Sequence, residues 1–127
     1  MNIPSNLKYT STDEWVKVDG NIATIGVTDH AQEQLSDVVF VEVTVSVGDK
    51  VAKKSTIATV ESVKAAADVN LPVSGKVVAV NEDLPQTPEL VNTDPYGKAW
   101  MIKIEMENLA ELDNLMDAAG YEKHTKE

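Results

Sequence analysis

Short runs in which apolar and polar residues alternate recur along this chain, with the two-residue period of β-strands. The clearest runs are residues 14–18, 22–27, 38–43, 56–63, 76–81 and 100–104. Asp19-Gly20 separates the first two runs and predicts a β-hairpin whose two central turn residues both need positive φ. The run 38–43 is apolar and largely β-branched, so we expect this strand to be buried on both faces.

Two segments have the pattern of helices instead. Asp29 can cap a short helix that ends near Ser36, with Gln32 three residues after the cap, as in a capping box. Asn108 can cap a final helix in the same way, with Gly120 as the residue that ends it. The apolar stripe of this final helix, which we expect to pack on the core, comprises Leu109, Leu112, Leu115, Met116 and Ala119. Residues 122–127 are polar and are expected to fray.

Many short strands with few helices predict a mainly β fold, a small sandwich or flattened barrel. The length of 127 residues fits one domain, which we place at residues 1–127. A chain of this size can bury about two-thirds of its unfolded surface, enough for a core of its own.

Composition removes several classes of function. The chain has no cysteine, so a disulfide framework, a thiolate metal site and a catalytic thiol are all excluded. Its net charge is −10, and all eleven basic side chains are lysines, which argues against a nucleic-acid partner. No run approaches the ~18 apolar residues of a membrane span. We therefore expect a monomeric cytoplasmic protein with no membrane partner, or a mitochondrial one if a leader has been removed.

No group of residues has the pattern of a catalytic centre. His30 and His124 are the only histidines and lie far apart in the sequence, which argues against a metal site or a catalytic triad. The six glycines form no phosphate-binding loop, and no pair of acids stands out. The absence of a nucleophile, base and orienting group together favours a carrier over an enzyme.

Lys64 stands out by its surroundings. A β-rich run rises to this lysine, three alanines follow it, and Glu61 and Asp68 flank it. The alanines have no bulk to shield an ammonium group, and residues 72–75 form a turn signal shortly afterwards. A solvated surface lysine is one interpretation, and a short helix through the alanines is another. We favour a third, in which Lys64 is the tip of a hairpin and is presented for covalent modification.

These residues carry a family resemblance. Residues 61–66, then Asp68, then residues 72–75 resemble the lipoylation segment of the glycine cleavage system H protein family. Further matches to that family cover nearly the whole chain, at residues 14–16, 28–29, 31–35, 39–41, 47–49, 81–82, 88–92 and 94–97, with Trp100. The resemblance implies the barrel-sandwich hybrid fold of lipoyl and biotinyl carriers, with a short helix and a C-terminal helix.

The resemblance also implies a cofactor, a site and a set of partners. Lys64 would carry lipoic acid as lipoyllysine, and Glu14 would lie near the loaded arm, although it could equally be an exposed strand acid. The chain would be a non-catalytic carrier that takes an aminomethyl group from glycine decarboxylase (P protein) to the aminomethyltransferase (T protein). Dihydrolipoamide dehydrogenase (L protein) would reoxidise the arm, and a lipoate ligase or a lipoyl/octanoyl transferase would attach it.

Alternatives with the same tip stay open. An H-like protein could relay lipoyl or octanoyl groups to other lipoate-dependent enzymes, and a scaffold would leave Lys64 unmodified. A biotin carrier is disfavoured because that family flanks its lysine with methionines, whereas Val63 and Ala65 flank Lys64 here. The chain departs from the family pattern at four positions, none of them next to Lys64: Asp13 in place of histidine, Ser36 in place of glycine, Ala67 in place of serine, and Leu71 in place of a small residue.

Overall fold

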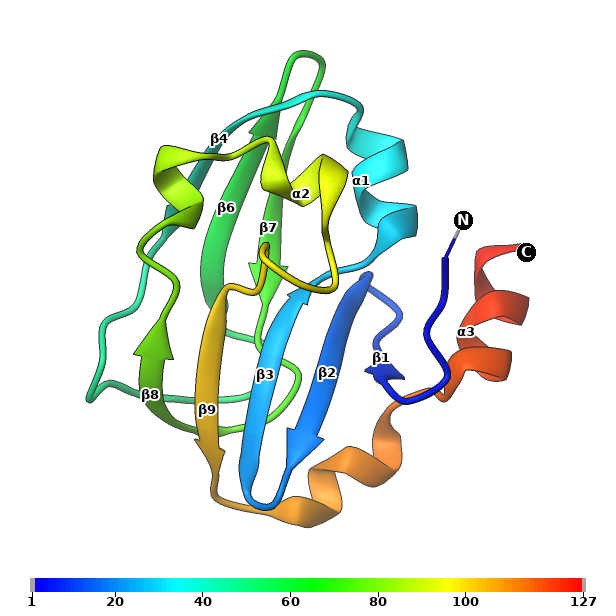
Figure 1. The fold of residues 1–127 in the computed structure, drawn as a ribbon. Coiled ribbons are helices and arrows are strands. Elements are labelled where there is room, and N and C mark those ends of the chain that lie inside the picture. Colours follow the sequence, from blue (N-terminus) through cyan, green and yellow to red (C-terminus); the bar gives the residue numbers. More distant parts are fainter. Residues whose placement is uncertain (1, 127) are drawn as a thin grey trace.

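The computed structural model describes residues 2–126 as two antiparallel sheets with helices at their edges (Figure 1). The larger sheet has six strands, which lie in the spatial order β1 (Lys8–Tyr9), β2 (Glu14–Asp19), β3 (Ile22–Val27), β9 (Ile102–Met106), β8 (Gly75–Val80) and β5 (Lys50–Val51). The smaller sheet has three, in the order β4 (Val38–Val43), β6 (Thr56–Ser62) and β7 (Ala66–Asn70). The helical elements are α1 (Asp29–Leu35), η1 (Leu84–Gln86), α2 (Leu90–Thr93), η2 (Leu109–Asn114) and α3 (Ala118–Thr125). The predicted mainly β fold with a short helix and a C-terminal helix is confirmed.

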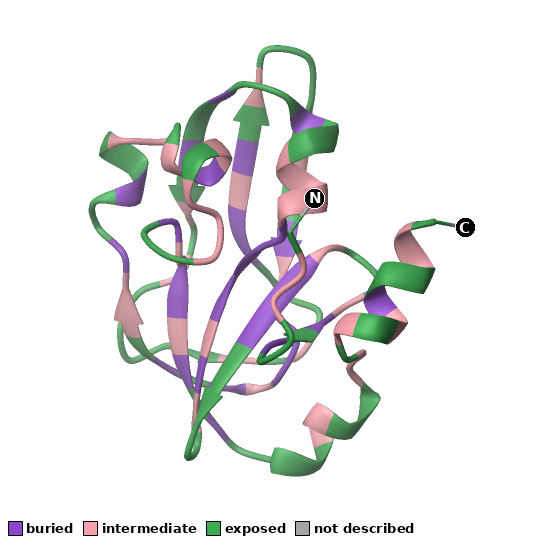
Figure 2. Cartoon of the chain, turned by 45° about the vertical axis from the view of Figure 1, so that its right-hand side comes forward, coloured by how far each residue is buried: buried purple, intermediate pink, exposed green. Residues whose placement is uncertain are grey.

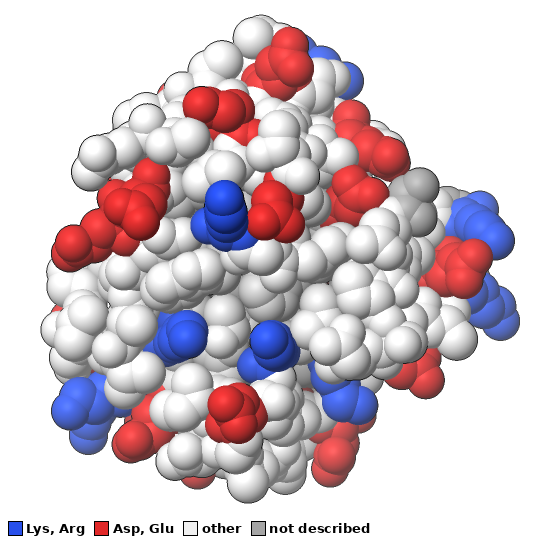
Figure 3. Space-filling model, in the orientation of Figure 1, with Lys and Arg blue, Asp and Glu red and all other residues white. Residues whose placement is uncertain are grey.

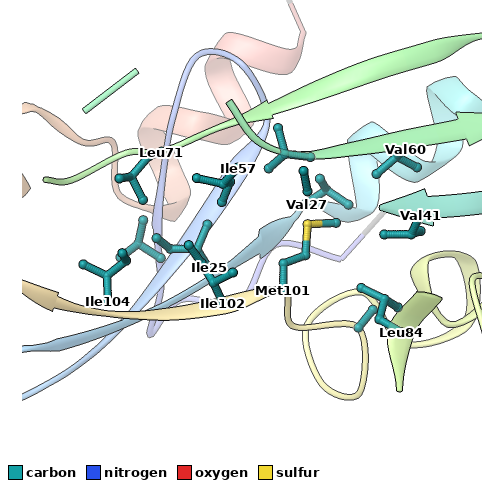
Figure 4. Close-up of a cluster of buried hydrophobic side chains, with 14 of the residues drawn as sticks. Ile25, Val27, Val41, Ile57, Val60, Leu71, Leu84, Met101, Ile102 and Ile104 are labelled. Carbon is teal, nitrogen blue, oxygen red and sulfur yellow. The ribbon is translucent and has the colours of Figure 1, made fainter. Parts of the chain in front are cut away.

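The main core lies between the two sheets (Figure 4). Ile25, Ile102 and Ile104 face it from the larger sheet, and Ile57 and Val60 face it from the smaller one; all five are fully buried. Apolar and polar side chains therefore alternate between the two faces of each sheet as the sequence pattern predicts, and the apolar face is turned to the interior. None of the helices within residues 2–126 has the length and apolar character needed to cross a membrane.

The β2–β3 hairpin is confirmed, but its turn differs from the expected one. Asp19 pairs with Ile22, so the two loop residues are Gly20 and Asn21 rather than Asp19 and Gly20. Only Gly20 has positive φ, at 63°. A turn with positive φ at its first central residue alone needs glycine at that position and nowhere else.

The prediction that strand β4 is buried on both faces is wrong. Val38 and Val41 are buried, whereas Val39 and Phe40 are 55% and 44% exposed. The pairing of β4 with β6 shifts register between Val38 and Phe40. A β-bulge at this point adds one residue to the strand, so two consecutive apolar side chains face solvent.

Helix α1 begins one residue earlier than expected. Thr28, and not Asp29, is its N-cap, and its Oγ1 accepts a hydrogen bond of 3.1 Å from the Ala31 N–H. Asp29 instead accepts a hydrogen bond of 2.6 Å from the Gln32 side chain. The helix ends at Ser36, whose φ of 64° lies in the left-handed region that favours glycine, the residue usual at this position in the resembling family.

The C-terminal helix lies later in the chain than predicted. Asn108 caps only the 3₁₀ helix η2, and the chain then extends so that Met116 and Tyr9 exchange two backbone hydrogen bonds of 2.8 Å. Asp117 caps α3 by accepting a hydrogen bond of 2.8 Å from the Gly120 N–H, so Gly120 lies in the first turn of a helix and does not end one. Residues 122–125, expected to fray, belong to α3, and Glu127 lies outside the described residues.

The predicted apolar stripe is therefore divided among several environments. Leu112 and Leu115 are half-buried against the main core, and Met116 packs on a second cluster, while Leu109 is 53% exposed. Ala119 is exposed on α3. The strand-like pairing of Met116 interrupts the helix on which the stripe was placed.

Tyr121 anchors α3 to the body of the protein. Its ring is fully buried and stacks on Tyr9 with the centroids 4.7 Å apart. Its hydroxyl donates a hydrogen bond of 2.8 Å to Asp13 Oδ1 and lies 2.7 Å from Thr28 Oγ1. These contacts form the centre of the second cluster, which also contains Leu7 and Trp15.

Replacement of Tyr121 tests this anchor. Tyr121→Ala should lower the free energy of unfolding by about 3–5 kcal/mol, because it removes a buried aromatic ring together with its hydroxyl contacts. Urea unfolding measures the loss. Glu122→Ala is the matched control on the same helix, since its exposed pair with Lys126 should change stability by less than about 0.5 kcal/mol. A Tyr121→Ala loss of the same small size would show that α3 is only loosely attached.

Two glycines should differ sharply in their tolerance of a methyl group. At Gly75 a Cβ would overlap the backbone oxygen of Glu105 on β9, and at Gly20 it would meet nothing within 4 Å. Gly75→Ala should therefore cost about 3 kcal/mol or more by overpacking. Gly20→Ala should cost about 1 kcal/mol through its left-handed backbone alone. Equal losses in urea unfolding would contradict the close approach of β8 and β9.

Candidate functional site

Lys64 lies in the tight turn between β6 and β7. Ser62 begins the turn, and its backbone N–H donates a hydrogen bond of 2.7 Å to the Ala65 oxygen. The Ser62 hydroxyl oxygen also accepts from the N–H groups of Lys64 and Ala65, at 3.3 and 3.1 Å. Serine is suited to this position because its short side chain satisfies the backbone donors of the turn. The hairpin predicted from the sequence is confirmed, and the helix through the alanines is wrong.

The hairpin extends beyond the packed part of the protein (Figure 2). Val60 and Val69 are buried, whereas Val63, Lys64, Ala65 and Ala66 are all exposed. The pairing of β6 with β7 continues to Glu61 opposite Ala66, so the backbone remains ordered close to the tip. The Lys64 side chain is thus presented to solvent on a regular two-stranded support.

Glu14 lies at the start of β2 and is only 2% exposed, so its interpretation as an exposed strand acid is wrong. Its Oε1 accepts hydrogen bonds of 2.6 and 2.5 Å from the hydroxyls of Thr10 and Thr12. Its Oε2 accepts a 3.2 Å hydrogen bond from the Asn70 N–H at the end of β7. The carboxylate therefore ties the N-terminal loop to the strand that descends from the Lys64 turn.

Burial raises the pKa of Glu14 above its ordinary value of 4.5, because desolvation penalises the charged form. The hydrogen bonds from Thr10, Thr12 and Asn70 act in the opposite direction, and the nearby negative charge of Asp13 adds to the increase. Glu14 is thus a buried ionisable group whose pKa is shifted mainly by desolvation. This behaviour is typical of groups in functional sites more than of surface acids.

Two cavities meet at Glu14 and Thr12. The smaller, of about 160 Å³, runs along the base of the hairpin, and its walls are Thr12, Asp13, Glu14, Val27, Ala31, Gln34, Leu35, Val60, Ala67, Asp68 and Val69. The larger, of about 510 Å³, lies on the other side and is lined by residues 9–12, Glu14, Lys53, Lys54, residues 70–72 and residues 114–116. Three carboxylates and several apolar side chains line the smaller cavity, so it can accommodate both apolar and polar groups.

The sequence did not identify the residues that hold Glu14. Thr10 and Thr12 are ordinary polar residues in a short loop, and Asn70 contributes only its backbone N–H, so no pattern points to them. Asp13, noted as a departure from the family, has φ of 73° and binds the Tyr121 hydroxyl. The negative charge that replaces a histidine is thus held beside Glu14 by the C-terminal helix.

The described residues contain no alternative centre with metal-binding geometry. No group of three His, Asp or Glu side chains within residues 2–126 is arranged to hold a metal ion. His124 contacts the backbone oxygen of Ser11 at 3.2 Å and packs near Tyr121, while His30 lies on α1.

The proton on Glu14 should make stability depend on pH. Since its pKa in the folded state lies above 4.5, folding takes up a proton in the window above that value, and the free energy of unfolding falls as pH rises through the window. Glu14→Gln has no proton to lose. The stability of the wild type minus that of Glu14→Gln should therefore be smaller at about pH 7 than at about pH 4.

Urea unfolding across this pH range measures the difference, and NMR titration of the Glu14 carboxyl carbon provides an independent control. The amide loses one acceptor oxygen, but this cost does not vary with pH. Two results together would contradict the predicted increase in the pKa of Glu14. These are a stability difference between the two proteins that stays constant with pH, and a Glu14 carboxyl that titrates at or below pH 4.5.

Comparisons with known proteins agree with this geometry. The family model described as "Glycine cleavage H-protein" matches residues 7–127. The glycine cleavage system H protein of Carboxydothermus hydrogenoformans is 54% identical over 125 residues, which cover 98% of this chain and 95% of the relative. That of Symbiobacterium thermophilum is 52% identical over 126 residues, with 99% and 98% covered. The mitochondrial glycine cleavage system H protein 2 of Arabidopsis thaliana is also 52% identical, with 96% and 78% covered.

A solved structure supports the same conclusion. The crystal structure of a glycine cleavage system H protein from Mycobacterium marinum superimposes with a TM-score of 0.88 at 30% identity, covering 98% of this chain and all of that one. The expected barrel-sandwich fold is confirmed by this likeness. H proteins are lipoyl carrier components of the glycine cleavage system and are not themselves catalytic, so the chain is a carrier and not an enzyme. The resemblance inferred from the residues around Lys64 is therefore confirmed: this chain belongs to the glycine cleavage H-protein family.

Proposed function

We propose that Lys64 carries lipoic acid in amide linkage and that the chain takes an aminomethyl group from glycine decarboxylase to the aminomethyltransferase. The observation that carries this proposal is the exposed Lys64 side chain in the β6–β7 turn of an H-protein-family chain. Dihydrolipoamide dehydrogenase would restore the oxidised arm. A lipoate ligase or a lipoyl/octanoyl transferase would attach it.

The surroundings of Lys64 fit such a group. Ala65 and Ala66 leave room around the amine, and the Ser62 hydrogen bonds hold the turn in one conformation. When attached, the dithiolane would supply the sulfur chemistry that this cysteine-free chain lacks. The task of the protein is then to hold the Lys64 nitrogen away from its own surface, where the active sites of other enzymes can reach it.

We also propose that Glu14 contacts the loaded arm. The smaller cavity begins at Ala67 and Asp68 on the hairpin and ends at Glu14, so one continuous hollow joins the base of the hairpin to the buried carboxyl group. Its apolar walls, which include Val60 and Leu35, suit a hydrocarbon chain. The carboxyl groups of Glu14 and Asp68 would favour an amine at the end of the arm over a neutral end.

The remaining expectations belong to the same proposal. A carrier that visits several enzymes functions as a single domain, here residues 1–127, and as a monomer. The cytoplasm is the compartment we propose, with the mitochondrion as the alternative for a chain whose leader has been removed. The alternative function is the relay of lipoyl or octanoyl groups to other lipoate-dependent enzymes. It would use the same Lys64 and would differ from the aminomethyl shuttle only in the partner enzymes.

Lys64→Arg tests the attachment site. The variant keeps the charge but lacks an acylatable amine, so labelling by a lipoate ligase should fall to background. The free energy of unfolding should change by less than about 0.5 kcal/mol, because the side chain is solvated. Intact mass and peptide mapping after ligase treatment measure the result, and a glycine-dependent assay with the partner enzymes should show no turnover.

The other ten lysines serve as internal controls. Lys53, Lys54 and Lys76 lie outside the hairpin, and each should remain unlabelled in both proteins. Label on any of them in the wild type, or label that persists in Lys64→Arg, would refute the assignment. If Lys64 is labelled but glycine-dependent turnover is absent while transfer to another lipoate-dependent enzyme occurs, the relay function replaces the shuttle.

A further inference from the structure

Three apolar side chains are exposed beside the turn that carries Lys64. We name Val39, Phe40 and Val63 the turn-side patch; their exposed fractions are 55%, 44% and 68%. Val39 and Phe40 belong to β4, and Val63 belongs to the turn itself. Large apolar side chains grouped at the surface mark contact sites for partners more often than isolated ones do.

The backbone holds these three residues together. The Val63 N–H donates a hydrogen bond of 3.1 Å to the Asp37 oxygen, which joins the turn to the residue before β4. Val38 pairs with Ser62 and Phe40 pairs with Glu61, so the bulge at Val39 lies directly beside the end of β6. The bulge is also the feature that turns both Val39 and Phe40 toward solvent. The patch is thus a rigid part of the same support that presents Lys64.

A hollow adjoins the patch. Its volume is about 360 Å³, and Phe40 forms one wall, with Val80 and Pro85 among the others. Two carboxylates, Glu42 and Glu82, also line it, and no lysine does. The hollow therefore combines an apolar floor with negative charge at its edges, which favours a partner that brings apolar and basic side chains together.

The charged side chains around the patch are mainly acidic. Asp37 and Glu42 each lie two residues from a member of the patch in sequence, and Glu61 pairs with Phe40 across the β4–β6 ladder. Figure 3 shows acidic side chains over much of the upper half of one face, where the hairpin lies, and lysines mainly over the lower half. Lys64 is the only lysine between residues 55 and 75. Complementary charge of this kind guides association and fixes orientation.

We propose that the turn-side patch and its acidic rim are the docking surface for the enzyme that acylates Lys64. The acidic rim comprises Asp37, Glu42, Glu61 and Glu82. This inference rests on the proposed role of Lys64 as the attachment point. The occupant is a protein surface with an apolar protrusion flanked by lysine or arginine. Such an enzyme must select one of eleven lysines, and the alanines after Lys64 have little surface for it to recognise. The patch lies close enough to be covered while Lys64 enters an active site.

The apolar part is tested by removing it. Val39→Ser/Phe40→Ser in the unmodified protein should lower kcat/KM for ligase-catalysed lipoylation of Lys64 by about tenfold or more, with the change in KM and not in kcat. Val47→Ser/Leu109→Ser is the matched control, since these two side chains are 64% and 53% exposed but lie outside the patch. The control should stay within about twofold of the wild type.

The acidic rim provides a second variant that does not alter apolar packing. Glu42→Lys/Glu82→Lys should raise KM by about tenfold at low salt and by less at high salt, because screening weakens contacts between exposed charges. Lys17→Glu/Lys103→Glu is the control: it also reverses two surface charges, in the opposite direction and on the larger sheet. It should leave KM within about twofold of the wild type. Melting temperatures of all variants establish that each is folded.

Competition gives a readout that does not depend on acylation of the variant. Lys64→Arg should inhibit lipoylation of the wild type by occupying the ligase, and Val39→Ser/Phe40→Ser/Lys64→Arg should inhibit about tenfold less well. The docking surface would be overturned if the patch and rim variants are folded and match the wild type in KM for lipoylation and in inhibition of the ligase. This holds even if the same variants are impaired in transfer to the aminomethyltransferase. Absence of label on Lys64 in the wild type would instead refute the proposed function, so the two failures are distinguishable.

Discussion

The packing of the two sheets against each other is the constraint on which the rest of the molecule depends. It buries Val60 and Val69 completely and Ala67 in part, whereas Val63, only three residues after Val60, is 68% exposed. Because the core ends near this level, the turn beyond it is held mainly by hydrogen bonds, among them those of the Ser62 hydroxyl and the bond from the Val63 N–H to the Asp37 oxygen. The same packing that stabilises the fold therefore leaves one short hairpin free to present Lys64.

Glu14, unlike Lys64, lies inside the packed part of the protein. A carboxyl group with 2% exposure is costly to bury, and burial is the largest influence on its pKa. Three hydrogen-bond donors offset part of this cost, and they come from the N-terminal loop and from β7. An apolar residue would avoid that penalty, but it would deprive the Thr10 and Thr12 hydroxyls and the Asn70 N–H of this acceptor. The Glu14 carboxyl group thus links the N-terminal loop to β7 at a point that both cavities share.

The sequence predicted the parts of the fold that follow from local periodicity, and it failed where distant contacts decide. The alternating runs, the β2–β3 hairpin and the Lys64 turn follow from patterns within a few residues. The bulge at Val39 could not be predicted, since an apolar run looks the same with or without one extra residue in its register. The spacing from Leu112 to Met116 fits a continuous helix, but Met116 pairs with Tyr9 between η2 and α3 and interrupts it. The site beyond Lys64 depends on Asn70 and on a fold that brings it to Glu14.

The exposed apolar residues of β4 need an explanation of their own. This strand is an edge of its sheet, and an edge strand with Val39 and Phe40 facing solvent risks pairing with another chain. The bulge limits that risk because it disrupts the flat backbone that such pairing requires, and the net charge of −10 opposes close approach of a second copy. Both features protect against self-association without covering the apolar side chains. A surface that is guarded against its own copies, yet left open beside Lys64, fits a partner of opposite charge that binds briefly and leaves.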